Sequence, residues 1–158
     1  MKNLFYIVLI GALILTGLQS KSQGANRPAN CDDASIIHQA DSIKLELSKQ
    51  GFIVVKEASM NMESEFEIPV IVPLTQGSWY QFVFIGDITS RLYEVRMFDW
   101  DEKQVAYQRK QWGDVDGNVI SYSYIPKFSE YHMMKPVQVN KKKKKLCGYV
   151  MLLKKVKQ

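Results

Sequence analysis

Two short acidic segments carry the side chains best suited to ligand chemistry. Residues 99–103 read DWDEK, and residues 114–118 read DVDGN. Carboxylates two positions apart on a tight turn are hard oxygen ligands of the kind that Ca²⁺ prefers. A tryptophan in a polar loop can stack on a sugar ring or anchor a protein interface. The candidate ligand-binding residues are therefore Asp99, Trp100, Asp101, Asp114 and Asp116.

No cofactor is expected from the sequence, with calcium as the single candidate. The segment 114–118 lacks the third acidic position and the distal glutamate of a complete calcium loop. The favoured interpretation of this segment is a hairpin turn, which Asp-Gly suits because both residues tolerate left-handed dihedral angles. Asp87, Asp99 and Asp101 also lie at the ends of predicted strands and would complete an oxygen cage if their loops shared one end of the molecule.

A run of five lysines forms the basic patch of the sequence: Lys141, Lys142, Lys143, Lys144 and Lys145. Such a run suits an acidic surface, such as a phosphorylated glycolipid, an anionic membrane or an acidic polysaccharide. The favoured interpretation of the run, however, is a solvated hairpin tip that guards a sheet edge. Nucleic acid is not an expected partner, since no further basic stripe accompanies the run.

Catalysis finds little support in the sequence. Glu63, Glu65 and Glu67 have the spacing of one strand face and would suit acid–base chemistry, but a solvent-facing strand edge explains them better. His38 and His132 are far apart, and the sequence contains neither G-x-S-x-G nor H-E-x-x-H. A non-enzyme is expected, and a hydrolase using Glu65, Glu67 or His132 is the least favoured reading.

The first 24 residues have the layout of a secretory signal peptide. Lys2 precedes an apolar run from Leu4 to Leu18, and small and polar residues follow as far as Gly24. The rival reading is a membrane anchor, but a helix of this length reaches about 23 Å, short of a hydrocarbon core of roughly 30 Å. Cleavage after Gly24 would leave one domain, residues 25–158, in a secreted or periplasmic location. Membrane contact is then expected only through the segment before cleavage, or weakly through the lysine run.

The two cysteines support the same compartment. Cys31 and Cys147 both follow the predicted signal peptide, and an even count outside the cytoplasm predicts one disulfide. It would join the start of the domain to its last strand. Two cysteines and two distant histidines do not have the spacing of a zinc site.

The periodicity predicts one helix followed by strands. Apolar residues recur at helical spacing between about 32 and 50, and Gly51 provides a stop. After Gly51 the period changes to two. Eight strands are expected, with a hairpin across 99–103 and prolines that place the second strand at an edge. The predicted strands are 52–57, 66–72, 79–85, 91–98, 105–112, 119–125, 131–139 and 146–154.

This pattern predicts a mainly β fold: an antiparallel β-sandwich, jelly-roll-like, with one N-terminal amphipathic helix. The aromatic residues of the strands are expected to pack between the two sheets. Residues 74–87, LTQGSWYQFVFIGD, with 91–105 and 120–133, resemble bacterial pre-peptidase C-terminal domains. The resemblance covers about half of the chain and departs from the family at Glu130, where the family has glycine. It implies a small secreted β-sandwich with an auxiliary role, in some members calcium or matrix binding, and it assigns no site residue.

Together these features predict a non-catalytic binding or accessory module of the bacterial cell envelope. It would recognise a glycan or an envelope protein through its aromatic and acidic loops. The alternative is a structural subunit that docks on an envelope complex through its helix or a sheet edge.

Overall fold

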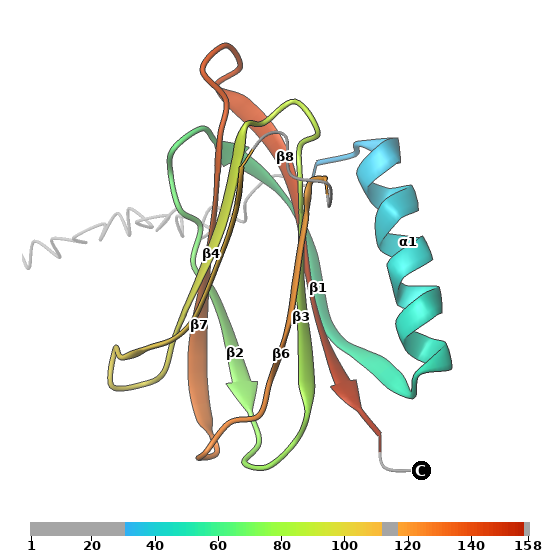
Figure 1. Cartoon of the computed structure of the whole chain (residues 1–158), viewed down its shortest axis with the longest axis vertical. Coiled ribbons are helices and arrows are strands. Elements are labelled where there is room, and N and C mark those ends of the chain that lie inside the picture. The colour runs from blue at the N-terminus through green and yellow to red at the C-terminus, as the bar shows by residue number, and fades with distance from the viewer. Residues whose placement is uncertain (1–30, 112–116, 157–158) are drawn as a thin grey trace, which may run out of the picture.

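The computed structural model describes residues 31–111 and 117–156, which form one helix and two antiparallel sheets (Figure 1). Helix α1 spans Ala34–Lys49, within the predicted range. Asp33 caps it, because its Oδ1 accepts hydrogen bonds from the backbone N–H groups of Ser35 at 2.9 Å and Ile36 at 3.3 Å. Gly51 follows the helix with φ 82°, a left-handed conformation that glycine adopts without strain.

Eight strands follow the helix in chain order. They are β1 (Phe52–Glu63), β2 (Val70–Leu74), β3 (Tyr80–Gly86), β4 (Leu92–Phe98), β5 (Gln104–Gln111), β6 (Val119–Tyr124), β7 (Glu130–Val139) and β8 (Lys145–Lys155). One sheet has the order β1-β8-β3-β6, and the other has the order β2-β7-β4-β5. The predicted β-sandwich is confirmed, and β2 lies at a sheet edge as its prolines indicated.

The connections between strands cross repeatedly from one sheet to the other, in the manner of a jelly roll. The β4–β5 connection is a hairpin within one sheet, as predicted across residues 99–103. The expectation of hairpins at 114–118 and at the lysine run was wrong. β5 and β6 lie in different sheets, as do β7 and β8, so each of these connections bridges the two layers.

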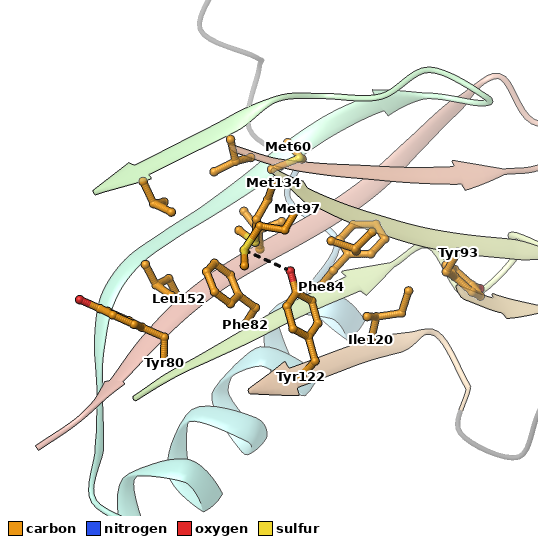
Figure 2. Packing of buried hydrophobic residues seen from close by; sticks show 14 of the residues in the cluster. Met60, Tyr80, Phe82, Phe84, Tyr93, Met97, Ile120, Tyr122, Met134 and Leu152 are labelled. Carbon is orange, nitrogen blue, oxygen red and sulfur yellow. Dashed lines mark hydrogen bonds between the residues drawn. The ribbon is translucent and has the colours of Figure 1, made fainter. Parts of the chain in front are cut away.

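The main core lies between the sheets and is rich in aromatic and methionine side chains (Figure 2). Phe82 and Tyr122 stack with ring centroids 5.3 Å apart, and the Tyr122 hydroxyl donates to Met97 Sδ at 3.7 Å. Burial raises the pKa of Tyr122 far above its ordinary value. Each large apolar side chain buried in this way contributes about 1.5–3 kcal/mol to stability.

A second core lies on the outer face of the β1-β8-β3-β6 sheet, where α1 packs. Ile36 and Ala40 of the helix are buried against Val83, Ile85 and Met151. The predicted disulfide is present: Cys31, just before α1, is bonded to Cys147 of β8, with Cα atoms 5.6 Å apart. Within the described residues, α1 is not apolar over a span that would cross a bilayer.

Candidate functional site

The β4–β5 hairpin presents the predicted tryptophan on the surface. Asp99 Oδ1 accepts a hydrogen bond from the Lys103 N–H at 2.8 Å, and the Asp99 N–H donates to the Lys103 carbonyl at 3.0 Å. Asp99 therefore shapes the loop, while Asp101 is exposed to solvent. Trp100 is 68% exposed, so the loop displays its indole instead of burying it.

Trp100 has an aromatic neighbour that the sequence analysis did not identify. The ring of Tyr131, at the start of β7, lies 5.9 Å from the Trp100 ring between centroids, tilted by 48°. Tyr131 is itself 53% exposed. A hollow of about 380 Å³ adjoins the two rings, and its lining residues are Pro73, Leu74, Trp100, Ser129, Glu130 and Tyr131. We call this the Trp100–Tyr131 hollow.

The hollow belongs to the uncovered side of the sandwich. Pro73 and Tyr131 are paired in register between β2 and β7 and both are exposed, whereas α1 packs against the other sheet. Further along the same sheet face, Lys135 bonds Glu67 at 2.7 Å, and Arg96 pairs with Glu94. The outer face of this sheet therefore combines exposed aromatic rings with charged and hydrogen-bonding groups.

The predicted acidic residues do not form one cluster. Asp87 directly follows β3 and lies at the end of the sandwich where β4 begins, because the first residue of β4 pairs with Val139 (Figure 1). Asp99 lies at the other end, because it follows Phe98, the last residue of β4, which pairs with Met133. Six residues of strand separate the two ends, about 20 Å. The oxygen cage of Asp87 with Asp99 and Asp101 is therefore wrong. Asp114 and Asp116 lie outside the described residues, and no group of three metal-ligating side chains occurs among residues 31–111 and 117–156.

Asp87 has a structural role that the sequence did not reveal. Its side chain is 4% exposed and bonds Lys143 Nζ at 2.7 Å through one oxygen, and Thr89 through the other. Burial opposes ionisation of this carboxyl, but the hydrogen bonds from Lys143 and Thr89 outweigh it and hold the pKa of Asp87 below its ordinary value. Lys143 is thus partly neutralised. All five lysines of the run are exposed, four on the inter-sheet loop and Lys145 at the start of β8.

The candidate catalytic residues are dispersed. The three glutamates do not share a strand face, because Glu63 ends β1, Glu65 adopts φ 75° in a turn, and Glu67 precedes β2. The Glu65 N–H donates a hydrogen bond to the carbonyl of Gln138 on β7. Gln138 is six strand residues from His132, so the backbones of Glu65 and His132 are about 20 Å apart. His132 is 1% exposed, and its Nε2 lies 3.1 Å from the Tyr124 hydroxyl. This histidine is held inside the sandwich, away from any bound substrate.

A larger hollow, of about 750 Å³, lies beside the C-terminal end of α1 and includes Trp79, Ile125 and Lys155. Trp79 was expected to pack between the sheets, but it lies outside the sandwich core and is 43% exposed. Its ring is already engaged: Phe52 contacts it edge-on at 5.8 Å, and Lys155 Nζ lies 4.6 Å from its centroid. Tyr107 is also exposed, whereas Tyr80, Tyr93 and Tyr122 are buried as predicted; Trp112 is outside the described residues.

No family model and no curated protein matches the sequence. Solved structures with a similar arrangement include a CBM4 module, at 12% identity and a TM-score of 0.42, covering 66% of this chain and 79% of the other. TmCBM61 in complex with β-1,4-galactotriose follows at 13% identity and a TM-score of 0.36, covering 68% of this chain and 84% of the other. Latent PorU from Porphyromonas gingivalis has 10% identity and a TM-score of 0.35, covering 65% of this chain and 13% of the other.

These identities and TM-scores are low, so the function is argued from this chain's own residues. The resemblance to pre-peptidase C-terminal domains remains a likeness of sequence motifs, since no family model matches. The β-sandwich that it implied is present.

Proposed function

We propose that this chain is an exported, non-catalytic module that binds a saccharide at the Trp100–Tyr131 hollow. The observation that supports the proposal is the pair of exposed aromatic rings, contributed by the β4–β5 loop and by β7, with centroids 5.9 Å apart. The predicted signal peptide and the disulfide fit a role outside the cytoplasm.

The chemistry of the hollow suits a sugar ring. One face of a pyranose presents C–H groups, which pack on an aromatic surface, while its hydroxyl groups need hydrogen-bond partners. Trp100 and Tyr131 supply the surface, with Pro73 beside them, and Ser129 and Glu130 supply polar atoms. The rings are tilted by 48°, so a ligand spanning both must be bent or must use one ring at a time.

Trp100 is favoured over Trp79 because its indole is free to receive a ligand. Trp100 is 68% exposed, whereas Trp79 is already packed against Phe52 and Lys155. Asp99 contributes by holding the loop that carries Trp100, through its bond to the Lys103 N–H. Calcium has no role in this proposal.

Calorimetric titration of the exported protein with a panel of neutral and acidic oligosaccharides tests the proposal. We expect one class to bind, and both Trp100→Ala and Tyr131→Ala to weaken it about tenfold or more, as removal of a central aromatic contact does. Phe66→Ala is the matched control, because Phe66 is an exposed aromatic residue in the β1–β2 connection, outside the hollow.

The proposal fails if no oligosaccharide binds, or if Phe66→Ala weakens binding as much as Trp100→Ala does. A stable oligomer in solution that is broken by Trp100→Ala, with no saccharide bound, would instead assign this face to protein docking.

A further inference from the structure

We infer that the end of the sandwich opposite the β4–β5 hairpin is a docking surface for an anionic lipid bilayer. This surface, which we call the basic end, consists of the β3–β4 loop, the β7–β8 loop and the first residue of β8. Its exposed members are Ile88, Arg91, Lys141, Lys142, Lys144 and Lys145. Both loops lie at the end away from the β4–β5 hairpin (Figure 1). The inference is independent of the saccharide proposal.

The two loops are fastened to each other. Asn140 Oδ1 accepts from the N–H groups of Lys142 and Lys143, at 2.9 and 3.0 Å, while Asn140 Nδ2 donates to Thr89 at 2.9 Å. The ion pair of Lys143 with buried Asp87 adds a second link between the loops. The lysine run is therefore part of an organised surface and is not a freely solvated tip.

Four lysines of this surface are available to a partner. Lys143 is committed to Asp87, but among the described residues no ion pair forms at Lys141, Lys142, Lys144 or Lys145, and each is exposed. Lysine side chains near a negatively charged bilayer each favour binding by about 1 kcal/mol. Four such charges within five consecutive residues are enough for a measurable, salt-dependent attraction.

An apolar side chain among the cations favours a bilayer over a soluble anion. Ile88, on the β3–β4 loop, is 70% exposed, the largest exposed fraction among the apolar side chains described. It borders a hollow of about 520 Å³ with Arg91 and Lys141. Inorganic phosphate offers nothing apolar to this side chain, and an acidic polysaccharide offers only the C–H faces of its sugar rings, with no apolar layer into which the side chain could insert. A bilayer interface accepts an apolar residue below the headgroups while the surrounding lysines remain at phosphate level.

Vesicle flotation tests the inference, using the exported protein with its N-terminus determined by mass spectrometry. We expect binding to phosphatidylcholine vesicles that contain phosphatidylglycerol, weaker binding without it, and a decline with added salt. Lys141→Gln with Lys142→Gln should weaken binding about thirtyfold, because each lysine contributes about 1 kcal/mol. The matched control is Lys103→Gln with Lys127→Gln, an equal charge change on exposed loop residues outside the basic end.

Ile88 separates a bilayer from a soluble anion. Ile88→Ser should weaken vesicle binding several-fold, and Ile88→Trp should show blue-shifted emission on anionic vesicles, whether or not the N-terminal segment is retained. The inference is overturned if the control pair weakens binding equally, or if Ile88→Ser has no effect. It is also overturned if soluble inorganic phosphate or an acidic polysaccharide binds as well as the vesicles do.

Discussion

At the scale of single residues, buried polar side chains hold the loops in place. Gln138 is completely buried, and its Oε1 accepts from the Asp87 N–H at 2.8 Å and from the Ser90 hydroxyl at 3.1 Å. The Tyr93 hydroxyl donates to the Asp87 carbonyl at 2.8 Å, and burial raises the pKa of Tyr93 to about 12. Gly86 is required beside this network, because a Cβ there would lie 2.5 Å from the Tyr93 ring. These contacts fix the β3–β4 loop at the basic end.

Asp87→Asn should lower the free energy of unfolding by about 1–2 kcal/mol at neutral pH, because the hydrogen bonds to a charged carboxylate weaken. The pKa of Asp87 is depressed in the folded state, so its stabilisation is fully present above the ordinary carboxyl pKa of about 3.9. It is lost as the pH falls through the folded-state pKa. Urea unfolding at pH 7 and at about pH 3 measures the difference, with exposed Asp101→Asn as control. A difference that stays constant with pH would contradict this role.

At the scale of elements, α1 decides which face of the sandwich remains open. The helix packs its apolar side on the β1-β8-β3-β6 sheet, where Lys44 bonds Glu57 at 3.1 Å and the Tyr149 hydroxyl donates to Glu57 at 2.6 Å. These two hydrogen bonds, that of Tyr149 above all, lower the pKa of Glu57 despite its partial burial. The other sheet has no such cover in the described chain, so its outer face can receive a ligand.

Removal of the helix cap tests how firmly α1 is formed. Asp33→Ala should destabilise the protein by about 1 kcal/mol, because two N–H groups of the first turn lose their acceptor. Thermal unfolding followed by circular dichroism measures the shift. Asp32→Ala is the matched control, since it removes the same charge one position earlier without removing the cap. Equal shifts for the two variants would show that Asp33 acts through charge alone.

At the scale of the whole molecule, the disulfide closes almost the entire described chain into one loop. Cys31 and Cys147 are 116 positions apart, and the bond ties the segment before α1 to a central strand of the sheet that the helix covers. A long closed loop reduces the entropy of the unfolded chain, which in this model stabilises the folded state. The bond also joins the start of the sandwich to the basic end.

Replacing Cys31 and Cys147 together by serine should lower the free energy of unfolding by about 4–5 kcal/mol. Guanidinium unfolding of the oxidised protein, of the same protein after reduction, and of the double variant measures this. The reduced protein and the variant should have similar midpoints, both well below that of the oxidised protein. Equal midpoints for all three would mean that the bond adds nothing to stability.

The sequence by itself determined the class of fold and most of its elements. The predictions of elements rest on local patterns: alternating residues along the strands, the helical spacing of Ile36 and Ala40, and the stop at Gly51. Such patterns can be recognised in the sequence without knowing which segments pack together. The disulfide also followed from the sequence, because the two cysteines behind a predicted signal peptide have only one intramolecular pairing. The exposure of Trp100 was suggested by its polar loop.

Only the tertiary structure decided what lies beside each candidate residue. Tyr131 contacts Trp100 although the two are 31 positions apart in the sequence, and Asp87 binds Lys143 although these two are 56 positions apart. The jelly-roll order of the strands brings both pairs together. The same order turned two expected hairpins into inter-sheet loops and sent Asp87 and Asp99 to opposite ends. Periodicity records which side of a strand a residue faces, but not which strand lies next to it, and a binding surface is made by neighbours.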